Sequence, residues 1–148
     1  MLEMYRARRQ EESGFTLVEL LVVMLILGIL AAIAIPAFFS QRDKGYDSDA
    51  KANARTVQTA LETYAVDHGG KYTGATMTNL ANIEGTITGM SGTGGGSVTV
   101  TPGSDTYTIV GDSDSGNAFT LPRNANGSLD YTCTATGDGG CPSTGNWG

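Results

Sequence analysis

The chain has 148 residues, a net charge of −6 and 40% apolar residues, which suits one domain with at most one appendage. Residues 1–14 hold three Arg and three Glu, so the remainder is equally acidic and lacks a general footprint for nucleic acid. Most glycines follow Gly69, whereas Leu, Ile, Val and Ala gather before it, so two compositional regimes share the chain.

A charged segment, residues 1–14, is followed by a long apolar one. From Phe15 to Phe39 the sequence is apolar apart from Thr16, Glu19 and its Gly and Pro residues. As a helix this segment spans about 37 Å, enough to cross a hydrocarbon layer of about 30 Å. It is therefore predicted to be a transmembrane helix. The arginines before it keep its N-terminus in the cytoplasm, and everything after Phe39 lies outside.

The next segment has the periodicity of an amphipathic helix. Apolar residues recur there at steps of three and four: Tyr46, Ala50, Ala54, Val57, Leu61 and Tyr64. Gly69 and Gly70 are expected to end this helix. We expect one long helix from about Phe15 to about His68, bent at Pro36, whose second half, about 40–68, packs its apolar stripe on the rest of the chain.

Residues 71–148 are predicted to form short antiparallel strands. Four segments alternate in polarity or are β-branched: Ser97–Thr101, Thr106–Val110, Ala118–Leu121 and Ser128–Thr134. Gly111–Asn117 and Asn124–Gly127 are predicted turns, and Gly89–Gly96 is a predicted surface loop. The predicted fold class is α+β, with a long N-terminal α-helix packed on a small antiparallel β-sheet. The first half of the helix is transmembrane. Its amphipathic second half belongs with the sheet to a head of residues 40–148.

The segment Gly14–Phe38 closely resembles the N-terminus of type IV pilins and of the related pseudopilins of type II secretion. The resemblance covers about 25 residues without a gap, and the head shares only the family's general layout. It implies that residues 1–14 are a leader, which a prepilin peptidase removes by cutting between Gly14 and Phe15, and that Phe15 is then N-methylated. An ordinary secretory signal is cut after its apolar region, whereas here that region stays in the product.

Glu19 lies inside the apolar segment, where a carboxylate costs about 2.5–3.5 kcal/mol on insertion scales. The resemblance implies that Glu19 acts in assembly by meeting the new amine of Phe15 in a neighbouring subunit, or a component of the assembly platform. The alternative is a glutamate close enough to the interface to stay hydrated. Gly28 and Pro36 bracket a stretch that, on the same resemblance, loses helical hydrogen bonds in the filament; the alternative is a simple kink.

Two features near the C-terminus suggest a disulfide and, more weakly, a cation. Cys133 and Cys141 stand close together among Gly, Asp and Pro, which suits a small disulfide loop better than a four-ligand metal site. Trp147 beside them is interpreted as a contact residue or part of a frayed tail. Asp112 and Asp114 resemble the start of an EF-hand, and pseudopilins often bind calcium. The pattern lacks a third oxygen ligand and a distal acid, so a solvated turn is favoured.

The sequence predicts a structural filament subunit and no enzyme, because its one histidine has no evident nucleophile to work with. The expected product is a type IV pilus-like filament on the cell surface, used for adhesion, motility or DNA uptake. Expected partners are further copies, the prepilin peptidase, the assembly platform with minor pilins, and the cytoplasmic membrane before assembly. No cofactor and no general nucleic-acid binding are expected. The alternatives are a pseudopilin, a minor subunit and, in a different class, a membrane-anchored or secreted binding domain.

Overall fold

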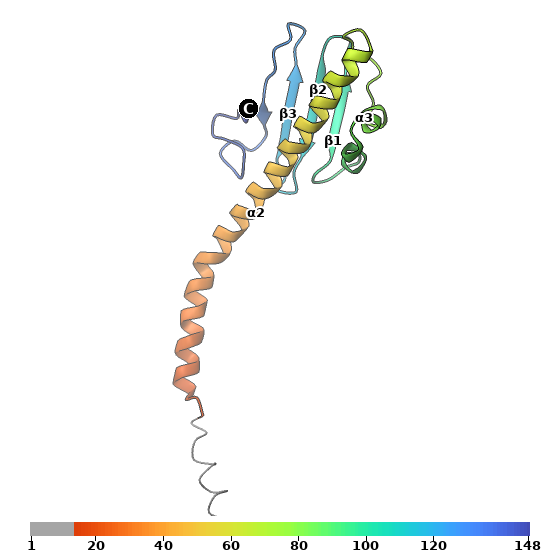
Figure 1. The fold of residues 1–148 in the computed structure, drawn as a ribbon. Coiled ribbons are helices and arrows are strands. Elements are labelled where there is room, and N and C mark those ends of the chain that lie inside the picture. Colours follow the sequence, from red (N-terminus) through yellow and green to blue (C-terminus); the bar gives the residue numbers. More distant parts are fainter. Residues whose placement is uncertain (1–13) are drawn as a thin grey trace, which may run out of the picture. The chain divides into compact units, whose positions relative to one another are not determined.

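The computed structural model describes residues 14–148, so the predicted leader lies outside the described residues except for Gly14. The elements of the described part are α2 (Leu17–Asp67), α3 (Met77–Ile83), the 3-10 helix η1 (Gly85–Met90) and the strands β1 (Val98–Pro102), β2 (Tyr107–Asp112), β3 (Ala118–Arg123) and β4 (Thr132–Cys133) (Figure 1). A long helix and a small antiparallel sheet confirm the α+β prediction.

Helix α2 runs through both regimes of the sequence. The chain forms two compact units, one ending at Phe38 and one of Phe39–Gly148, and α2 contributes to each. The helix includes Gly28 and Pro36. It begins two residues later and ends one residue earlier than predicted. At its C-terminus Gly70 N donates to Ala65 O over 2.7 Å, the long-range bond of a Schellman motif.

The sheet of the second unit is an antiparallel meander in the order β1-β2-β3-β4. Val100 pairs with Ile109, and Ile109 pairs with Leu121, so alternate residues of the central strands share one face. The C-terminal part of α2 lies across the sheet (Figure 1). Gly111 permits this approach, because a Cβ there would lie 2.7 Å from Ala50 O of the helix.

The core of the head lies between that helix and the sheet. Ala50, Ala54, Val57 and Leu61 of α2 are fully buried, as are Ile109, Phe119 and Leu121 of the strands. Each large apolar side chain buried in this way contributes about 1.5–3 kcal/mol. The predicted stripe is wrong at its first member. Tyr46 is only half-buried, with Arg42 5.1 Å from its ring, and the charged neighbour Asp47 is buried instead.

Three other parts of the head differ from the predictions. Helices α3 and η1 were not predicted, and the expected loop at Gly89–Gly96 begins only after Met90. The fourth predicted strand shortens to β4, with isolated bridges at Leu129 and Asn146. The turn predicted at Asn124–Gly127 is confirmed, because Gly127 N donates to Asn124 O over 2.9 Å. The turn uses residues that would otherwise be available to lengthen β3 and β4.

Candidate functional site

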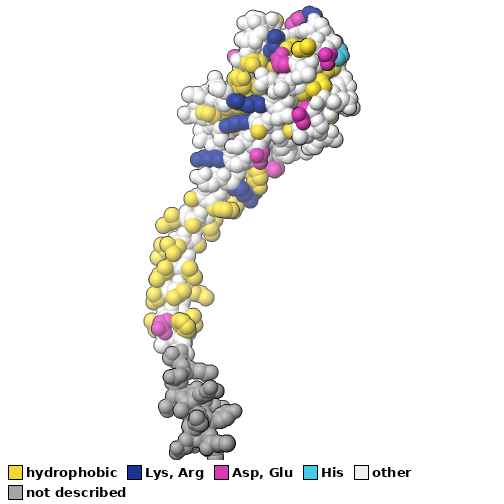
Figure 2. Space-filling view, viewed as in Figure 1, with side chains coloured by type: hydrophobic (Ala, Val, Ile, Leu, Met, Phe, Trp, Pro, Cys, Tyr) yellow, Lys and Arg dark blue, Asp and Glu magenta, His cyan; other side chains and the backbone are white. Residues whose placement is uncertain are grey.

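The first functional feature is the apolar surface at the start of α2. The large apolar side chains from Phe15 to Phe39 are between 44% and 86% exposed, and Figure 2 shows them in yellow along the helix. Within the described residues, this helix is long and apolar enough to cross a membrane. Exposed apolar area of this extent marks a surface that lipid or other protein covers.

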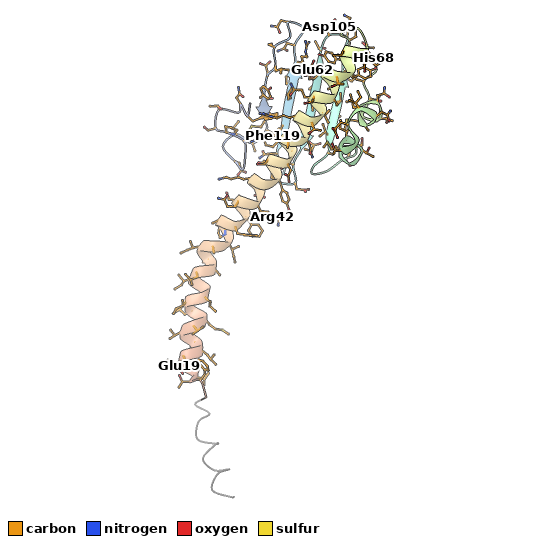
Figure 3. All side chains as sticks on the ribbon, viewed as in Figure 1. Glu19, Arg42, Glu62, His68, Asp105 and Phe119 are labelled. Carbon is orange, nitrogen blue, oxygen red and sulfur yellow. A yellow bond between two sulfur atoms is a disulfide. The ribbon has the colours of Figure 1, made fainter. Side chains whose placement is uncertain are left out.

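Glu19 forms a capping box with Thr16 at the beginning of α2 (Figure 3). Its Oε2 accepts hydrogen bonds from Thr16 N and Thr16 Oγ1, each over 2.8 Å, and Glu19 N donates to Thr16 Oγ1 over 3.2 Å. These reciprocal bonds satisfy donors that the first turn of a helix otherwise leaves free. The spacing Thr-x-x-Glu is the recognised signature of this motif, so the sequence did carry a signal for this role.

Gly14 and Phe15 precede that cap in a stretch without regular secondary structure. The Phe15 side chain is 77% exposed, and nothing lies within 4 Å of the position a Cβ would take at Gly14. The peptide bond between them is therefore accessible. Cleavage there, methylation of Phe15 and melting between Gly28 and Pro36 stay predictions.

Asp47 is a buried carboxylate that sequence reasoning missed. Its side chain is 0% exposed, and three donors from other parts of the head converge on it. Asn117 Nδ2 donates to Oδ2 over 2.9 Å, Gly140 N donates to the same oxygen over 2.6 Å, and Ser115 Oγ donates to Oδ1. The carboxylate therefore ties α2 to the β2–β3 turn and to the C-terminal segment.

Burial favours the neutral form of Asp47 and by itself raises the pKa of this carboxyl. Hydrogen bonds from Ser113, Ser115, Gly140 and Asn117 favour the charged form more strongly and hold the pKa below its usual value. Asp47 is thus ionised at neutral pH, and its hydrogen-bond donors within residues 14–148 are neutral groups.

The predicted disulfide between Cys133 and Cys141 is confirmed. It closes a loop that contains Gly140, so the covalent link holds one of the donors to Asp47 in place. The two interpretations of Trp147 are wrong. Its ring is 7% exposed, lies edge-on to Phe119 and Tyr131, and its Nε1 donates to Thr132 O over 2.9 Å. Trp147 is a core residue that fixes the C-terminus.

A second polar cluster connects α2 to the opposite end of the sheet. Glu62 accepts hydrogen bonds from Tyr72 Oη over 2.8 Å and from Tyr107 Oη over 2.9 Å, and Arg123 Nε lies 3.6 Å from the same carboxylate. Burial first, and then the adjacent Glu62 charge, raise the pKa of Tyr72 to about 12 and raise the pKa of Tyr107 as well. Both phenols are protonated donors at neutral pH.

The two aspartates considered for calcium lie at the β2–β3 turn. Asp112 Oδ2 accepts a hydrogen bond from Ser97 Oγ over 3.3 Å, and Asp114 is exposed. In the described part of the chain no three His, Cys, Asp or Glu side chains group closely enough to hold a metal ion. The preference for a solvated turn over a calcium site stays a prediction.

Comparisons with known proteins extend the resemblance beyond the first helix. Residues 9–35 match the family model of the prokaryotic N-terminal methylation motif. The chain is 41% identical over 61 residues to the type II secretion system core protein G of Pseudomonas aeruginosa, covering 41% of this chain and 43% of that protein. It is 32% identical over 120 residues to the type IV major fimbrial protein FimA of Dichelobacter nodosus, covering 77% and 74%. It is 30% identical over 148 residues to the fimbrial protein EcpC of Eikenella corrodens, covering 88% and 87%.

The length of these matches differs between the two kinds of relative. The match to the secretion protein spans less than half of that protein, whereas the matches to FimA and EcpC continue through the head. Since the likeness to both fimbrial proteins extends over about three quarters or more of each chain, the protein belongs to the type IV pilin family.

Proposed function

We propose that this chain is a structural subunit of an extracellular filament of the type IV pilus kind. The observation that carries the proposal is the apolar surface from Phe15 to Ile35, whose large side chains are between 44% and 86% exposed. A bundle of such helices from many copies would remove this surface from water. Because exposure of each large apolar side chain to water costs about 1.5–3 kcal/mol, a helix that leaves the lipid stays covered only inside such a bundle.

Processing is the second part of the proposal. A prepilin peptidase cuts between Gly14 and Phe15 on the cytoplasmic side, and Phe15 becomes a methylated N-terminal residue in a single-pass membrane precursor. The cut creates a positive amine that uncut subunits lack. Within the filament this amine meets the Glu19 carboxylate of a neighbouring copy, which offsets the cost of an acid in an apolar environment. The protein itself has no catalytic role and requires no cofactor.

A pseudopilin is the second candidate, favoured by the 41% identity to a secretion core protein. That identity covers 61 residues, whereas the likeness to the fimbrial proteins includes most of the head. The head is the part that distinguishes the subunits of one kind of filament from those of another, because an apolar helix suits any helical bundle. We therefore place the pilin first.

The test is N-terminal sequencing with intact-mass measurement on filaments sheared from the cell surface. We expect a methylated Phe15 at the N-terminus and a mass two protons short, because of the Cys133–Cys141 disulfide. A product beginning at Met1, or a soluble product beginning near Ile35, would contradict the proposal. Deleting the gene separates the two candidates: loss of surface filaments supports a pilin, whereas loss of protein secretion with filaments intact supports a pseudopilin.

A further inference from the structure

Positive charge in the head is concentrated on a short part of α2. Of six basic residues after Gly14, four lie between Arg42 and Arg55, whereas residues 56–148 hold two basic and eight acidic residues. Figure 2 shows dark-blue side chains gathered on this part of the visible face. That stretch also holds Asp43, Asp47 and Asp49, so its net charge is +1, whereas the net charge of residues 56–148 is −6.

Three of these residues form what we call the basic face: Lys44, Lys51 and Arg55. Steps of seven and four place them on one side of the helix. Lys51 Nζ donates to Gly140 O and lies 5.0 Å from the Phe119 ring, and Arg55 Cζ lies 5.5 Å from the Trp147 ring. These contacts hold the cations on the side of α2 that borders the C-terminal segment.

Within the described chain no salt bridge includes a member of the basic face, although the buried Asp47 carboxylate lies one helical turn from Lys51. The ion pairs of residues 14–148 are Lys71 with Asp105 and Arg123 with Glu62, and neither includes a member of this face. Lys44 and Arg55 are exposed. Exposed cations that form no ion pair within residues 14–148 are suited to attract a partner with negative charge.

The other side of α2 carries a groove with a carboxylate at its edge. Its volume is about 410 Å³, and it is lined by Thr56, Thr59, Ala60, Thr63, Ile83 and Glu84. Glu84 is exposed, and Ile83 is 40% exposed. By the step of about 100° per residue, the groove lies roughly 110° around the helix axis from the basic face. Figure 1 shows α3 and the C-terminal segment on opposite sides of α2 accordingly.

We propose that the basic face of one copy binds the groove of the next copy, with Arg55 directed to the Glu84 carboxylate. The proposal rests on the proposed function, because it assigns the contact between heads in the filament. Two different patches of one molecule that bind each other form a heterologous contact, which repeats from copy to copy and gives an open helical array unless it closes into a ring. Opposite charges on these patches fix which sides meet.

Charge reversal tests this contact in cells that express the full chain. Arg55→Glu alone and Glu84→Lys alone each place like charges together and should lower the yield of surface filaments by about tenfold. Arg55→Glu combined with Glu84→Lys restores the attraction and should return the yield to within about twofold of the native chain. Arg42→Glu is the matched control, since Arg42 lies outside the basic face, and it should assemble normally. Immunoblots of the membrane fraction verify that each variant accumulates.

Glu84 also caps η1, because its Oε1 accepts hydrogen bonds from Thr86 N and Thr86 Oγ1 over 3.2 and 3.0 Å. A second test therefore measures the proximity of the two positions rather than filament yield, in mixed filaments whose native chains keep the Glu84 cap. Chains with Arg55→Cys and chains with Glu84→Cys are expressed at low level beside the native chain, so that mixed filaments form. Oxidation should give a covalent dimer of the two variants, and pairing Arg42→Cys with Glu84→Cys should give none.

The outcomes separate the two proposals. If the native chain forms no filament beginning at Phe15, the proposed function is wrong. If native filaments form and the cysteine pair gives no covalent dimer in the mixed filaments, the contact proposed here is overturned while the filament function stands. Normal yield from both single charge reversals overturns the contact as well.

Discussion

Asp47 shows how local sequence can conceal a buried charge. An aspartate one position after Tyr46 in an amphipathic helix has the pattern of a solvated residue, because its donors lie 68 to 93 residues further along the chain. Those donors are small polar residues and a backbone N–H in turns, which carry no periodic signal. Only the packed head brings them together, so the charge and its partners could not be predicted from the sequence.

Replacing Asp47 should destabilise the head and alter its dependence on pH. The pKa of Asp47 is lowered in the fold, so its stabilising effect is present above the unfolded value of 3.8 and is lost as pH falls through the folded value. We expect Asp47→Asn to lower the free energy of unfolding at pH 7 by about 2–3 kcal/mol, because the amide turns an N–H₂ toward donors. The difference from the native chain should shrink as the pH falls below 3.8.

The measurement is thermal unfolding of the full chain in detergent micelles, at pH 7 and pH 3, followed by circular dichroism. Asp49→Asn serves as the control, since Asp49 is an exposed carboxylate on the same helix. Equal losses for Asp47→Asn and Asp49→Asn would contradict the role of the buried carboxylate.

The two tyrosines beside Glu62 should ionise at a higher pH than ordinary tyrosines. The folded pKa of Tyr72 is about 12, above its ordinary 10.0, and that of Tyr107 is raised too. Their contribution to stability is therefore complete below about pH 10 and is lost as the pH rises through the folded pKa. In an absorbance titration near 295 nm, we expect two phenols to ionise only above about pH 11.

Glu62→Gln removes the negative charge and leaves one oxygen acceptor where the carboxylate offers a separate oxygen to each phenol, so it should lower the pKa at which they ionise. Asp67→Asn, at an exposed position further along α2, is the control and should leave the titration unchanged. A native chain in which every tyrosine ionises together near pH 10 would count against this cluster.

At the scale of elements, long periodic segments were predictable and short ones were not. Helix α2 and strands β1 to β3 were found within two residues at most ends, because periodicity and turn residues mark them. Helix α3 has seven residues, too few to establish a helical period, although Thr76 caps it by accepting a hydrogen bond from Asn79 N. Strand β4 depends on long-range partners, so its length was not fixed by local pattern.

The disulfide and Asp47 should be energetically coupled. Closing a small loop contributes about 2–3 kcal/mol by restricting the unfolded chain. Replacing Cys133 and Cys141 by Ala removes this term and also frees Gly140, whose N–H binds Asp47. We therefore expect the double replacement to cost more in the native chain than in the Asp47→Asn background, by about 1 kcal/mol.

A double-mutant cycle measures this coupling, with free energies of unfolding taken at pH 7 in micelles for all four chains. The matched cycle uses Asp49→Asn, whose carboxylate contacts no residue of the disulfide loop. Identical costs of cysteine removal in the native and Asp47→Asn backgrounds would show that the loop acts through chain entropy alone.

At the scale of the whole molecule, the two regimes of the sequence have different requirements. The head buries its own core and satisfies its polar groups with residues from Phe39 onward. The segment from Phe15 to Phe38 has no such core, so it requires lipid or neighbouring helices. Composition predicted this division, because apolar residues without a polar face indicate surroundings other than water.

Glu19 has two roles to be separated: it caps α2 in the single chain, and the proposed function assigns it to subunit contacts in the filament. Two substitutions separate these roles. Glu19→Gln keeps an acceptor suited to the capping box but removes the charge, whereas Thr16→Val keeps the charge and removes the threonine hydroxyl from the cap. If charge drives assembly, Glu19→Gln should lose surface filaments as fully as Glu19→Ala, while Thr16→Val assembles.

Membrane fractionation accompanies the filament count, because all three variants should still insert. Losing one cap costs only about 1 kcal/mol, and the apolar helix retains its length. The opposite pattern, in which Glu19→Gln assembles and Thr16→Val does not, would assign the glutamate to helix initiation and remove it from the subunit contact. Under the proposed cleavage the Phe15 amine forms only after the cut, so the charge-dependent result would predict that uncut subunits stay in the membrane.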